Sequence, residues 1–386
     1  MTTTKHPLSA FAKASDISVE DFERLCQQHT APDDYPMATD IAANVLIYDA
    51  AQITHYETTA LKAEWAHALM NGPGVIVIRQ AFSDLSLIDR MSQTFDQICQ
   101  QEHAQGSGAD HFAKAGANSR IWNAFEKSAL LDPEGFIHYY KNPVLQLVAE
   151  SWLGPGYQIT AQMNTVHPGG SAQDPHRDYH LGFQENEQVA QYPLHMHQAS
   201  ASLTLQGAVA HSDMPLASGP TLLLPFSQQY PLGYLAWRDP NFRELFHQYA
   251  VQLPLEKGDA VFFNPALFHA AGANTTEDHH RCANLLQISA AFGKPMETVD
   301  RYRISQRLYP SLLPLWNDQL SAVEQAAILA ASCDDYSFPS NLDTDPPLNG
   351  MAPQTHSAMT REALKTQLDA SAYEQACSRH QQKRRS

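Results

Sequence analysis

The run QITAQMNTV, residues 158–166, opens the stretch of sequence that decides the fold. From this run to about Phe292, short segments alternate apolar and polar side chains and are separated by proline, glycine, asparagine and aspartate. Such alternation is typical of half-buried strands, and frequent turn residues between them are typical of a sandwich or barrel. Further examples are QASASLTLQG (198–207), GDAVFFN (258–264) and RCANLLQISAAF (281–292). The stretch therefore predicts a β-rich core of several short strands.

Helical patterns flank this region on both sides. Apolar side chains recur at helical spacing in ALKAEWAHALMN, residues 60–71, and in SAVEQAAILAAS, residues 321–332. We therefore expect an α+β protein that is mainly β, with helices around its core. Three parts are expected: an N-terminal extension over residues 1–59, the main domain with its N-terminal helices over residues 60–295, and a helical C-terminal extension and tail over residues 296–386.

The bulk composition narrows the class of protein and its partners. Of the 386 residues, 43% are hydrophobic and 17% are charged, which is typical of a globular protein with a sizeable core. The formal net charge of -16 repels phosphate backbones and anionic lipid. We therefore expect a small-molecule substrate, and neither nucleic acid nor a membrane as partner. Nothing in the sequence indicates an oligomeric state.

The cysteines and the N-terminal residues indicate the cellular compartment. The 5 cysteines are scattered along the chain and form no CxxC pair, which is typical of reduced thiols. The N-terminal residues contain no apolar segment like that of a secretory signal, and no apolar run reaches membrane-spanning length. These observations favour a cytoplasmic protein.

The motif with the clearest chemistry is DPHRDYH, residues 174–180. In a strand, the side chains of His176 and Asp178 project to the same face, while Arg177 points to the other face. One imidazole and one carboxylate form half of a two-histidine, one-carboxylate triad. Such a triad holds one face of an iron ion and leaves the remaining positions open for oxygen chemistry. Because an isolated HxD pair arises often by chance, the prediction depends on a third ligand.

The segment KGDAVFFNPALFHAAGAN, residues 257–274, contains the candidate for that ligand, His269. This histidine follows a predicted strand, and Arg281 lies twelve positions after it, at the start of the next apolar run. A guanidinium has the planar fork that binds a carboxylate through two N–H groups. A dicarboxylic 2-oxo acid needs such a cation at its far end, because its near end chelates the iron.

Taken together, these residues resemble the phytanoyl-CoA dioxygenase family. That family carries H-x-D, a distal H-x-x-G-x-N and a following arginine, matched here by residues 176–178, residues 269–274 and Arg281. Other segments that resemble the family are GPGVIVIRQAFSD (72–84), QMNTV (162–166) and DMPLASGPTLLLPFSQQY (213–230). The resemblance covers roughly residues 60–295.

The resemblance implies a double-stranded β-helix, or jelly-roll, core that holds Fe(II) and the co-substrate 2-oxoglutarate. It assigns His176, Asp178 and His269 as the catalytic metal ligands, and Arg281 as the residue that binds the far carboxylate. The implied activity is that of a dioxygenase that hydroxylates a C–H bond of a small molecule and releases succinate and CO2. Related halogenases have a small residue at the position of Asp178, so the carboxylate favours hydroxylation.

Two features depart from the family pattern. The spacing between His269 and Arg281 is one residue longer than usual, which leaves His279 and His280 as competing ligands. The usual PGSH-like turn reads PFSQQY, residues 225–230, in a segment that borders the mouth of the active site in the family. The substrate is therefore expected to differ from those of other members.

Further contacts to the co-substrate are predicted on two strands. Gln162 and Asn164 share one face of the strand before the HxD motif, and Asn164 matches a family position that hydrogen-bonds the oxo acid. Ser202 and Thr204 share a face of the following strand, where a hydroxyl often meets the far carboxylate. The alternative is that these polar side chains face solvent on half-exposed strands.

Two other classes of function stay open. One is a jelly-roll binding protein that keeps the fold without turnover. The other is a zinc or manganese lyase or hydrolase that uses the same three ligands.

Overall fold

A computed structural model describes residues 10–104, 118–347 and 349–385 of the chain. The chain forms two compact units, each assembled from separate stretches of the sequence. The first unit comprises Met1–Ala81, Phe112–Asn118 and Thr165–Ala283, and the second comprises Phe82–His111, Ser119–Asn164 and Asn284–Ser386. The predicted division into three consecutive parts remains a prediction.

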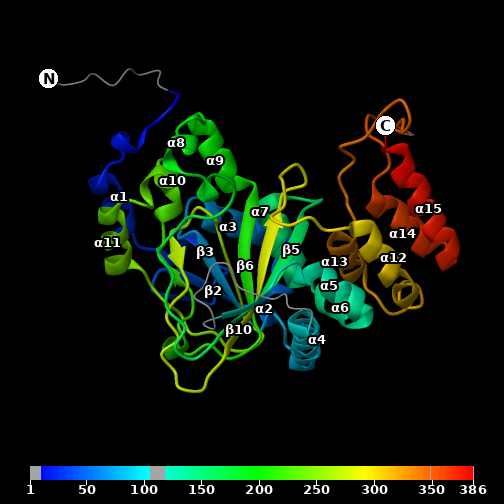
Figure 1. Ribbon diagram of the computed structural model, residues 1–386, viewed down its shortest axis with the longest axis horizontal. Helices are drawn as coiled ribbons and strands as arrows, with labels where there is room; N and C mark the ends of the chain where they lie inside the picture. Colours follow the sequence, from blue (N-terminus) through cyan, green and yellow to red (C-terminus); the bar gives the residue numbers. More distant parts are fainter. Residues whose placement is uncertain (1–9, 105–117, 348, 386) are drawn as a thin grey trace. The chain divides into compact units, whose positions relative to one another are not determined.

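The first unit is built on a mixed sheet with the strand order β1-β2-β3-β8-β6 (Figure 1). These strands are β1 (Asp40–Ala42), β2 (Val45–Asp49), β3 (Val75–Arg79), β6 (Thr204–Ala210) and β8 (Ala260–Phe263). Strands β2 and β3 are parallel, whereas β8 is antiparallel to both of its neighbours. A second, two-stranded sheet pairs β7 (Leu222–Leu223) with β9 (His269–Ala270).

Strand β3 occupies the centre of this sheet because its sequence suits burial on both faces. It reads VIVIR, and its first four side chains are all buried. β-Branched residues pack well on a pleated surface, and a strand covered on both faces reads as a continuous apolar run. Its neighbour β8 reads AVFF and is buried throughout. The predicted strand at residues 258–264 is thus present with slightly different ends.

The helices of the first unit flank these strands. They are α1 (Val19–Cys26), α2 (Ala50–Ile53), α3 (Thr58–Met70), α8 (Asn186–Val189), α9 (Leu194–Ser202), α10 (Gly233–Ala236) and α11 (Pro240–Tyr249). Helix α3 corresponds to the helix predicted at residues 60–71. It begins after Glu57, whose carboxylate accepts hydrogen bonds from the backbone N–H groups of Thr59 and Ala60.

The prediction of a strand through QASASLTLQG was wrong in its first half. Ser202 is the last residue of α9, and β6 begins only at Thr204. The run of alternating alanine and serine contains no β-branched side chain, and alanine is the best helix former. Ser202 and Thr204 therefore do not share a strand face, and the Ser202 hydroxyl donates to the backbone carbonyl of Gln198 within the helix.

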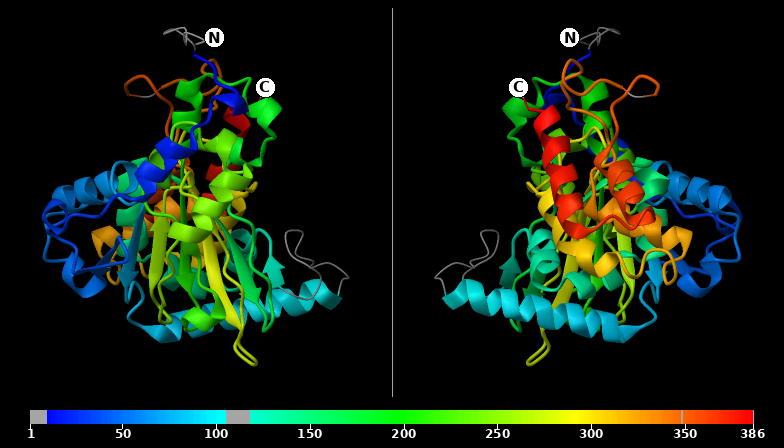
Figure 2. Two further views of the ribbon diagram at one scale, coloured as in Figure 1. Left: turned by 90° about the vertical axis from the view of Figure 1, so that its left-hand side faces the viewer. Right: turned by 90° about the vertical axis from the view of Figure 1, so that its right-hand side faces the viewer.

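The second unit contains the strand order β10-β5-β4. These strands are β4 (Asn118–Ile121), β5 (Gln158–Val166) and β10 (Arg281–Ser289), whose residues Asn118, Thr165, Val166 and Arg281–Ala283 belong to the first unit. The helices are α4 (Leu85–Ala104), α5 (Ala124–Leu131), α6 (Pro133–Tyr140), α7 (Pro143–Leu153), α12 (Arg301–Leu312), α13 (Ala322–Ser332), α14 (His356–Lys365) and α15 (Ala370–Lys383). Figure 2 shows α4 as one long, uninterrupted helix, and α12 contacts α13, α14 and α15.

The expected fold class is confirmed, but the description as mainly β was imprecise. Helices hold 45% of the described residues and strands hold 15%. Four helices follow the last strand, and α8, α9, α10 and α11 lie within the stretch that was expected to be β-rich. None of the helices in the described ranges has the length and apolar character needed to cross a bilayer.

A buried histidine in the C-terminal helices makes the stability of the second unit depend on pH. The ring of His356 stacks on Tyr302, and its Nε2 lies 3.0 Å from the hydroxyl of Ser305. Burial, with smaller contributions from His380 and two arginines, lowers the pKa of His356 from 6.5 to about 3. The unfolded chain therefore binds a proton at a pH where the folded chain does not. The contribution of neutral His356 to the free energy of unfolding is fully present above pH 6.5, and it is lost as the pH falls toward 3.

We expect acidification from pH 7 to pH 5 to lower the free energy of unfolding by about 2 kcal/mol through His356 alone. The measurement is urea unfolding of the wild type and of His356→Gln at both pH values. Between pH 7 and pH 5, the free energy of unfolding of His356→Gln should fall by about 2 kcal/mol less than that of the wild type. His247→Gln, at an exposed position of α11, is the control. An identical pH dependence in His356→Gln and the wild type would contradict the prediction.

Candidate metal centre

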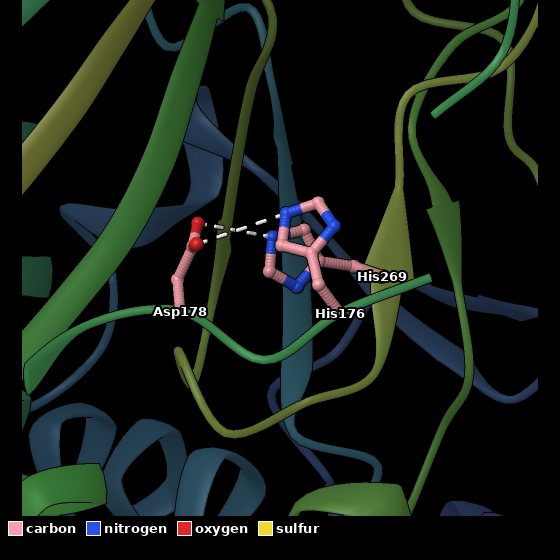
Figure 3. A group of neighbouring side chains, drawn as sticks. All are labelled: His176, Asp178 and His269. Atoms are coloured by element: carbon pink, nitrogen blue, oxygen red, sulfur yellow. Dashed lines mark ion pairs between the residues drawn. The ribbon is translucent and has the colours of Figure 1, made fainter. Parts of the chain in front are cut away.

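The three predicted metal ligands come together in the first unit (Figure 3). The candidate ligand atoms of His176, Asp178 and His269 all lie within 4.8 Å of one another. The distance from His269 Nε2 to Asp178 Oδ2 is 3.3 Å, and the distance from His176 Nε2 to Asp178 Oδ1 is 3.7 Å. In the part of the chain that the structure describes, this is the one group of three or more such side chains with ligand spacing.

The backbone explains why these side chains meet, although the HxD segment is not the strand that was predicted. His176 forms an isolated antiparallel bridge with His269, the first residue of β9. The two residues exchange both backbone hydrogen bonds, with N–O distances of 3.0 and 3.1 Å. The N–H of Asp178 donates to the carbonyl of Pro265 at 2.9 Å. Directly paired residues place their side chains on the same face, so the bridge brings the two imidazoles together.

Each imidazole is oriented by a backbone carbonyl. Nδ1 of His176 lies 2.8 Å from the carbonyl oxygen of Asp174, and Nδ1 of His269 lies 2.8 Å from that of Leu267. A carbonyl accepts only, so Nδ1 of each neutral ring carries the proton and Nε2 keeps its lone pair. Both Nε2 atoms face the carboxylate of Asp178 (Figure 3). Metal-binding histidines are commonly oriented in this way.

The electrostatics keep His176 and Asp178 in the protonation states that a metal requires. Burial lowers the pKa of His176 and keeps its ring neutral at neutral pH. Burial on its own raises the pKa of the Asp178 carboxyl, but the interactions with His176, His269 and Gln206 outweigh it. The pKa of Asp178 is therefore held well below its ordinary value, and the carboxylate is ionised.

Gln206 is a neighbour of the site that the sequence reasoning missed. It lies on β6, and its side-chain amide donates a hydrogen bond to Oδ2 of Asp178. The sequence held one signal for Gln206: it lies two residues after Thr204, a predicted site residue, and residues i and i+2 of a strand share a face. The amide fixes the carboxylate in the orientation in which it faces both histidines.

Replacing Gln206 with leucine is expected to weaken metal binding by about 10-fold or more, because partners that orient a ligand typically contribute 10- to 100-fold to metal affinity. The measurement is a titration of the metal-free protein with Co(II), followed by its d–d absorption. Gln191→Leu is the matched control, since Gln191 is exposed and its side-chain amide donates to the backbone carbonyl of Glu187. Equal affinities for the wild type and Gln206→Leu would refute the assigned role.

Arg281 lies in the same unit as the three ligands and is buried, with 7% of its surface exposed. Its Nη1 donates to the carbonyls of Ser218 at 2.8 Å and Gly272 at 3.4 Å. Among the residues described, no carboxylate lies within ion-pair distance of its guanidinium. Burial lowers the pKa of Arg281 to about 10, so it stays charged at neutral pH. A buried cation without an acidic partner is suited to bind an anion.

The other predicted co-substrate contacts are distributed between the two units. Thr204 is the buried first residue of β6 in the first unit. Gln162 and Asn164 lie on β5 in the second unit. The amide of Gln162 donates to Gln287, while that of Asn164 is buried and its Oδ1 has no hydrogen-bond partner among the described residues. The roles of all three toward an oxo acid remain predictions.

The two histidines that were left open as competing ligands contact other groups. Nε2 of His279 lies 2.7 Å from the carbonyl oxygen of Asp213, and Nδ1 of His280 lies 2.9 Å from Nδ1 of His167. Neither belongs to the ligand group formed by His176, Asp178 and His269.

The donor set fits a divalent transition metal. Two neutral imidazoles and one carboxylate, presented from one side, are the ligands of mononuclear non-haem iron sites with open positions. Zinc accepts the same donors, so the ligand set alone does not select the metal. Two histidines, one carboxylate and a buried arginine without a carboxylate partner in the described ranges lie within one unit, and they make this a candidate non-haem metal site.

The chain belongs to the phytanoyl-CoA dioxygenase family. The model of this family, described as Phytanoyl-CoA dioxygenase (PhyH), matches residues 70–282, which is more than half of the chain. The resemblance noted from the HxD motif, the distal histidine and Arg281 is thereby confirmed. No curated protein matches the chain.

Several solved structures are similar to this one at low sequence identity. The epimerase SnoN of nogalamycin biosynthesis is 17% identical, with a TM-score of 0.40, over 61% of this chain and 84% of its own. The carbocyclase SnoK of the same biosynthesis is 19% identical, with a TM-score of 0.42, over 58% and 83%. HygX from Streptomyces hygroscopicus, solved with nickel and 2-oxoglutarate bound, is 12% identical, with a TM-score of 0.40, over 58% and 86%.

Proposed function

We propose that this protein is an Fe(II)- and 2-oxoglutarate-dependent dioxygenase that hydroxylates a C–H bond of a small-molecule substrate. The observation that carries the proposal is the combination of the His176–Asp178–His269 group with Arg281. The first offers a metal one face of ligands. The second is a buried cation without an acidic partner among the described residues. Each of the two features is expected for this chemistry, and together they favour a dicarboxylate co-substrate.

In this proposal, His176, Asp178 and His269 would hold Fe(II), the two histidines through the Nε2 atoms that face the carboxylate. The bound ion supplies the activation of dioxygen, and the overall reaction turns substrate, dioxygen and 2-oxoglutarate into hydroxylated substrate, succinate and CO2. Arg281 binds the far carboxylate of the oxo acid through its planar fork. Thr204, Asn164 and Gln162 are assigned as further polar contacts to the same co-substrate.

The carboxylate of Asp178 also bears on the outcome of the reaction. It is fixed by Gln206 and occupies the position at which halogenases of related sequence have a small residue. A carboxylate in this position leaves no room for a bound halide, and so hydroxylation is the outcome that we propose.

The test is a screen for succinate release with the purified protein, Fe(II), ascorbate, 2-oxoglutarate and a library of small metabolites. The expected result is succinate formation that depends on Fe(II) and rises with one class of substrate, together with a hydroxylated product. Binding of 2-oxoglutarate without succinate formation under any condition would identify a binding protein instead. A protein that purifies with zinc or manganese and forms no succinate would support a lyase or hydrolase.

A further inference from the structure

Arg177 separates the two ligands of the HxD motif, and its side chain points away from them into the protein. Only 3% of its surface is exposed, and no carboxylate in the described ranges lies within ion-pair distance of it. Its Nη2 donates to the carbonyl oxygens of Ser227 at 2.6 Å and Tyr230 at 3.0 Å. These acceptors belong to the segment that follows β7, far from the HxD motif in the sequence.

Aromatic rings and a glycine fix the position of this guanidinium. Its Cζ lies 5.2 Å from the ring centre of Tyr234 and 5.2 Å from that of Phe268. A Cβ atom at Gly233 would lie 1.8 Å from the same Cζ, so a larger residue at position 233 would have to displace the guanidinium. A planar cation is suited to contact ring faces while it donates to two carbonyls in one plane. The side chain of Arg177 is thus held in one arrangement.

Ser227 extends this connection to the other ligand-bearing segment. Its Oγ accepts a hydrogen bond from the backbone N–H of Phe268 at 2.8 Å and donates to the carbonyl of Leu224 at 2.6 Å. Phe268 immediately precedes His269 in the sequence. Ser227 therefore contacts Arg177 through its carbonyl and the backbone beside His269 through its hydroxyl.

We propose that Arg177 and Ser227 are positioning residues that tie the His176–Asp178 segment to the His269 segment from behind the ligands. This inference rests on the proposed metal site. A metal tolerates only small errors in ligand distance, and a functional site loses performance when its support is loosened by about 1 Å. The bridge between His176 and His269 consists of two backbone hydrogen bonds, so the second connection restrains the angle between the two segments.

The alternative is that the two residues contribute to folding alone. A contribution to folding predicts lower stability of the metal-free protein with an unchanged metal site once the protein is folded. A positioning role predicts that the folded variants bind the metal more weakly and with altered geometry. The two roles differ in the absorption spectrum of bound Co(II), because d–d bands report the arrangement of the ligands and not the stability of the chain.

The variants are Arg177→Met, which keeps the length but removes the donors, Arg177→Lys, which keeps only the charge, and Ser227→Ala, which removes the hydroxyl. Arg238→Met is the control for loss of an arginine from an aromatic face, since Arg238 stacks on Trp237 and contacts no ligand segment. Ser128→Ala is the control for loss of a buried hydroxyl. Each protein is prepared without metal, checked for folding by circular dichroism, and titrated with Co(II).

We expect Arg177→Met and Ser227→Ala to raise the Kd for Co(II) by about 10-fold or more and to shift its d–d bands, as losses of orienting partners do. Arg177→Lys should recover only part of the affinity, because an ammonium lacks the planar fork. In the double variant, the Kd for Co(II) should rise by less than the product of the two single-variant factors, because both residues act through one connection. The two controls should keep the wild-type Kd and spectrum.

Two outcomes would overturn the inference, and they are distinguishable from each other. Unchanged Kd and spectrum in folded Arg177→Met and Ser227→Ala would overturn the positioning role and leave the proposed metal site intact. A wild-type protein that binds no Co(II) would overturn the metal site and the positioning role together. Weaker, spectrally altered binding in the two variants, without any oxidation by the wild type, would support the positioning role while the proposed function fails.

Discussion

Replacement of Asp178 with alanine is expected to abolish substrate oxidation and to lower the affinity for Co(II) or Fe(II) by more than about 100-fold. The carboxylate is the single anionic ligand of the group and faces both Nε2 atoms. Changes to partners that only orient a ligand already cost 10- to 100-fold, so the loss of a ligand has a larger effect. The measurements are metal titration and succinate release with the substrate found in the screen.

Asp174→Asn is the matched control for this variant. Asp174 lies in the same segment, its carboxylate is 78% exposed, and only its backbone carbonyl contacts His176. The substitution removes a negative charge near the site while it keeps that carbonyl, and so activity should stay near that of the wild type. Product formation coupled to succinate release in Asp178→Ala would overturn the metal assignment.

The second large effect is expected at Arg281. Replacing it with glutamine should raise the KM for 2-oxoglutarate by about two to three orders of magnitude, because breaking a buried ion pair typically costs about 3–5 kcal/mol. Metal affinity should not change, since Arg281 contacts the carbonyls of Ser218 and Gly272 and none of the three ligands. The KM of Arg281→Lys for 2-oxoglutarate should lie between those of the wild type and Arg281→Gln, because lysine keeps the charge and lacks the planar fork.

A comparison of oxo acids makes this prediction specific. The wild type should prefer 2-oxoglutarate over a 2-oxo acid that lacks the far carboxylate, and Arg281→Gln should lose most of this preference. Arg24→Gln, at an exposed arginine of α1, controls for the removal of a positive charge. A preference that survives in Arg281→Gln would show that another residue binds the far carboxylate.

The sequence predicted the ligand group because spacing and residue type are sufficient for it. The alternation of side chains places His176 and Asp178 on one side, and Arg281 follows His269 at the start of β10. The three side chains come together although the HxD segment is not a strand, because a bridge pairs His176 with His269. The strand through Ser202 failed because short alternating runs of alanine and serine carry no side chain that prefers a sheet.

Contacts that depend on tertiary structure were beyond the reach of the sequence. Gln206 contacts Asp178 because β6 lies beside the ligand segment, and its spacing from Thr204 alone does not predict that contact. Arg177 was predicted to point away from the ligands, but its acceptors, Ser227 and Tyr230, are distant in the chain. The excess of helix over strand also escaped prediction, because helices such as α9 and α11 lie within the stretch that the alternation of side chains marked as β-rich.

The bridge between His176 and His269 joins two segments that are far apart along the chain. In the unfolded state, holding such segments together closes a long loop, whose entropic cost grows only slowly with its length. A metal ion bound by the folded protein alone acts as a reversible cross-link between them, and it stabilises the fold in proportion to the logarithm of its free concentration. The free concentration of metal then determines the stability of the folded chain, as well as the fraction of the protein that carries the metal needed for catalysis.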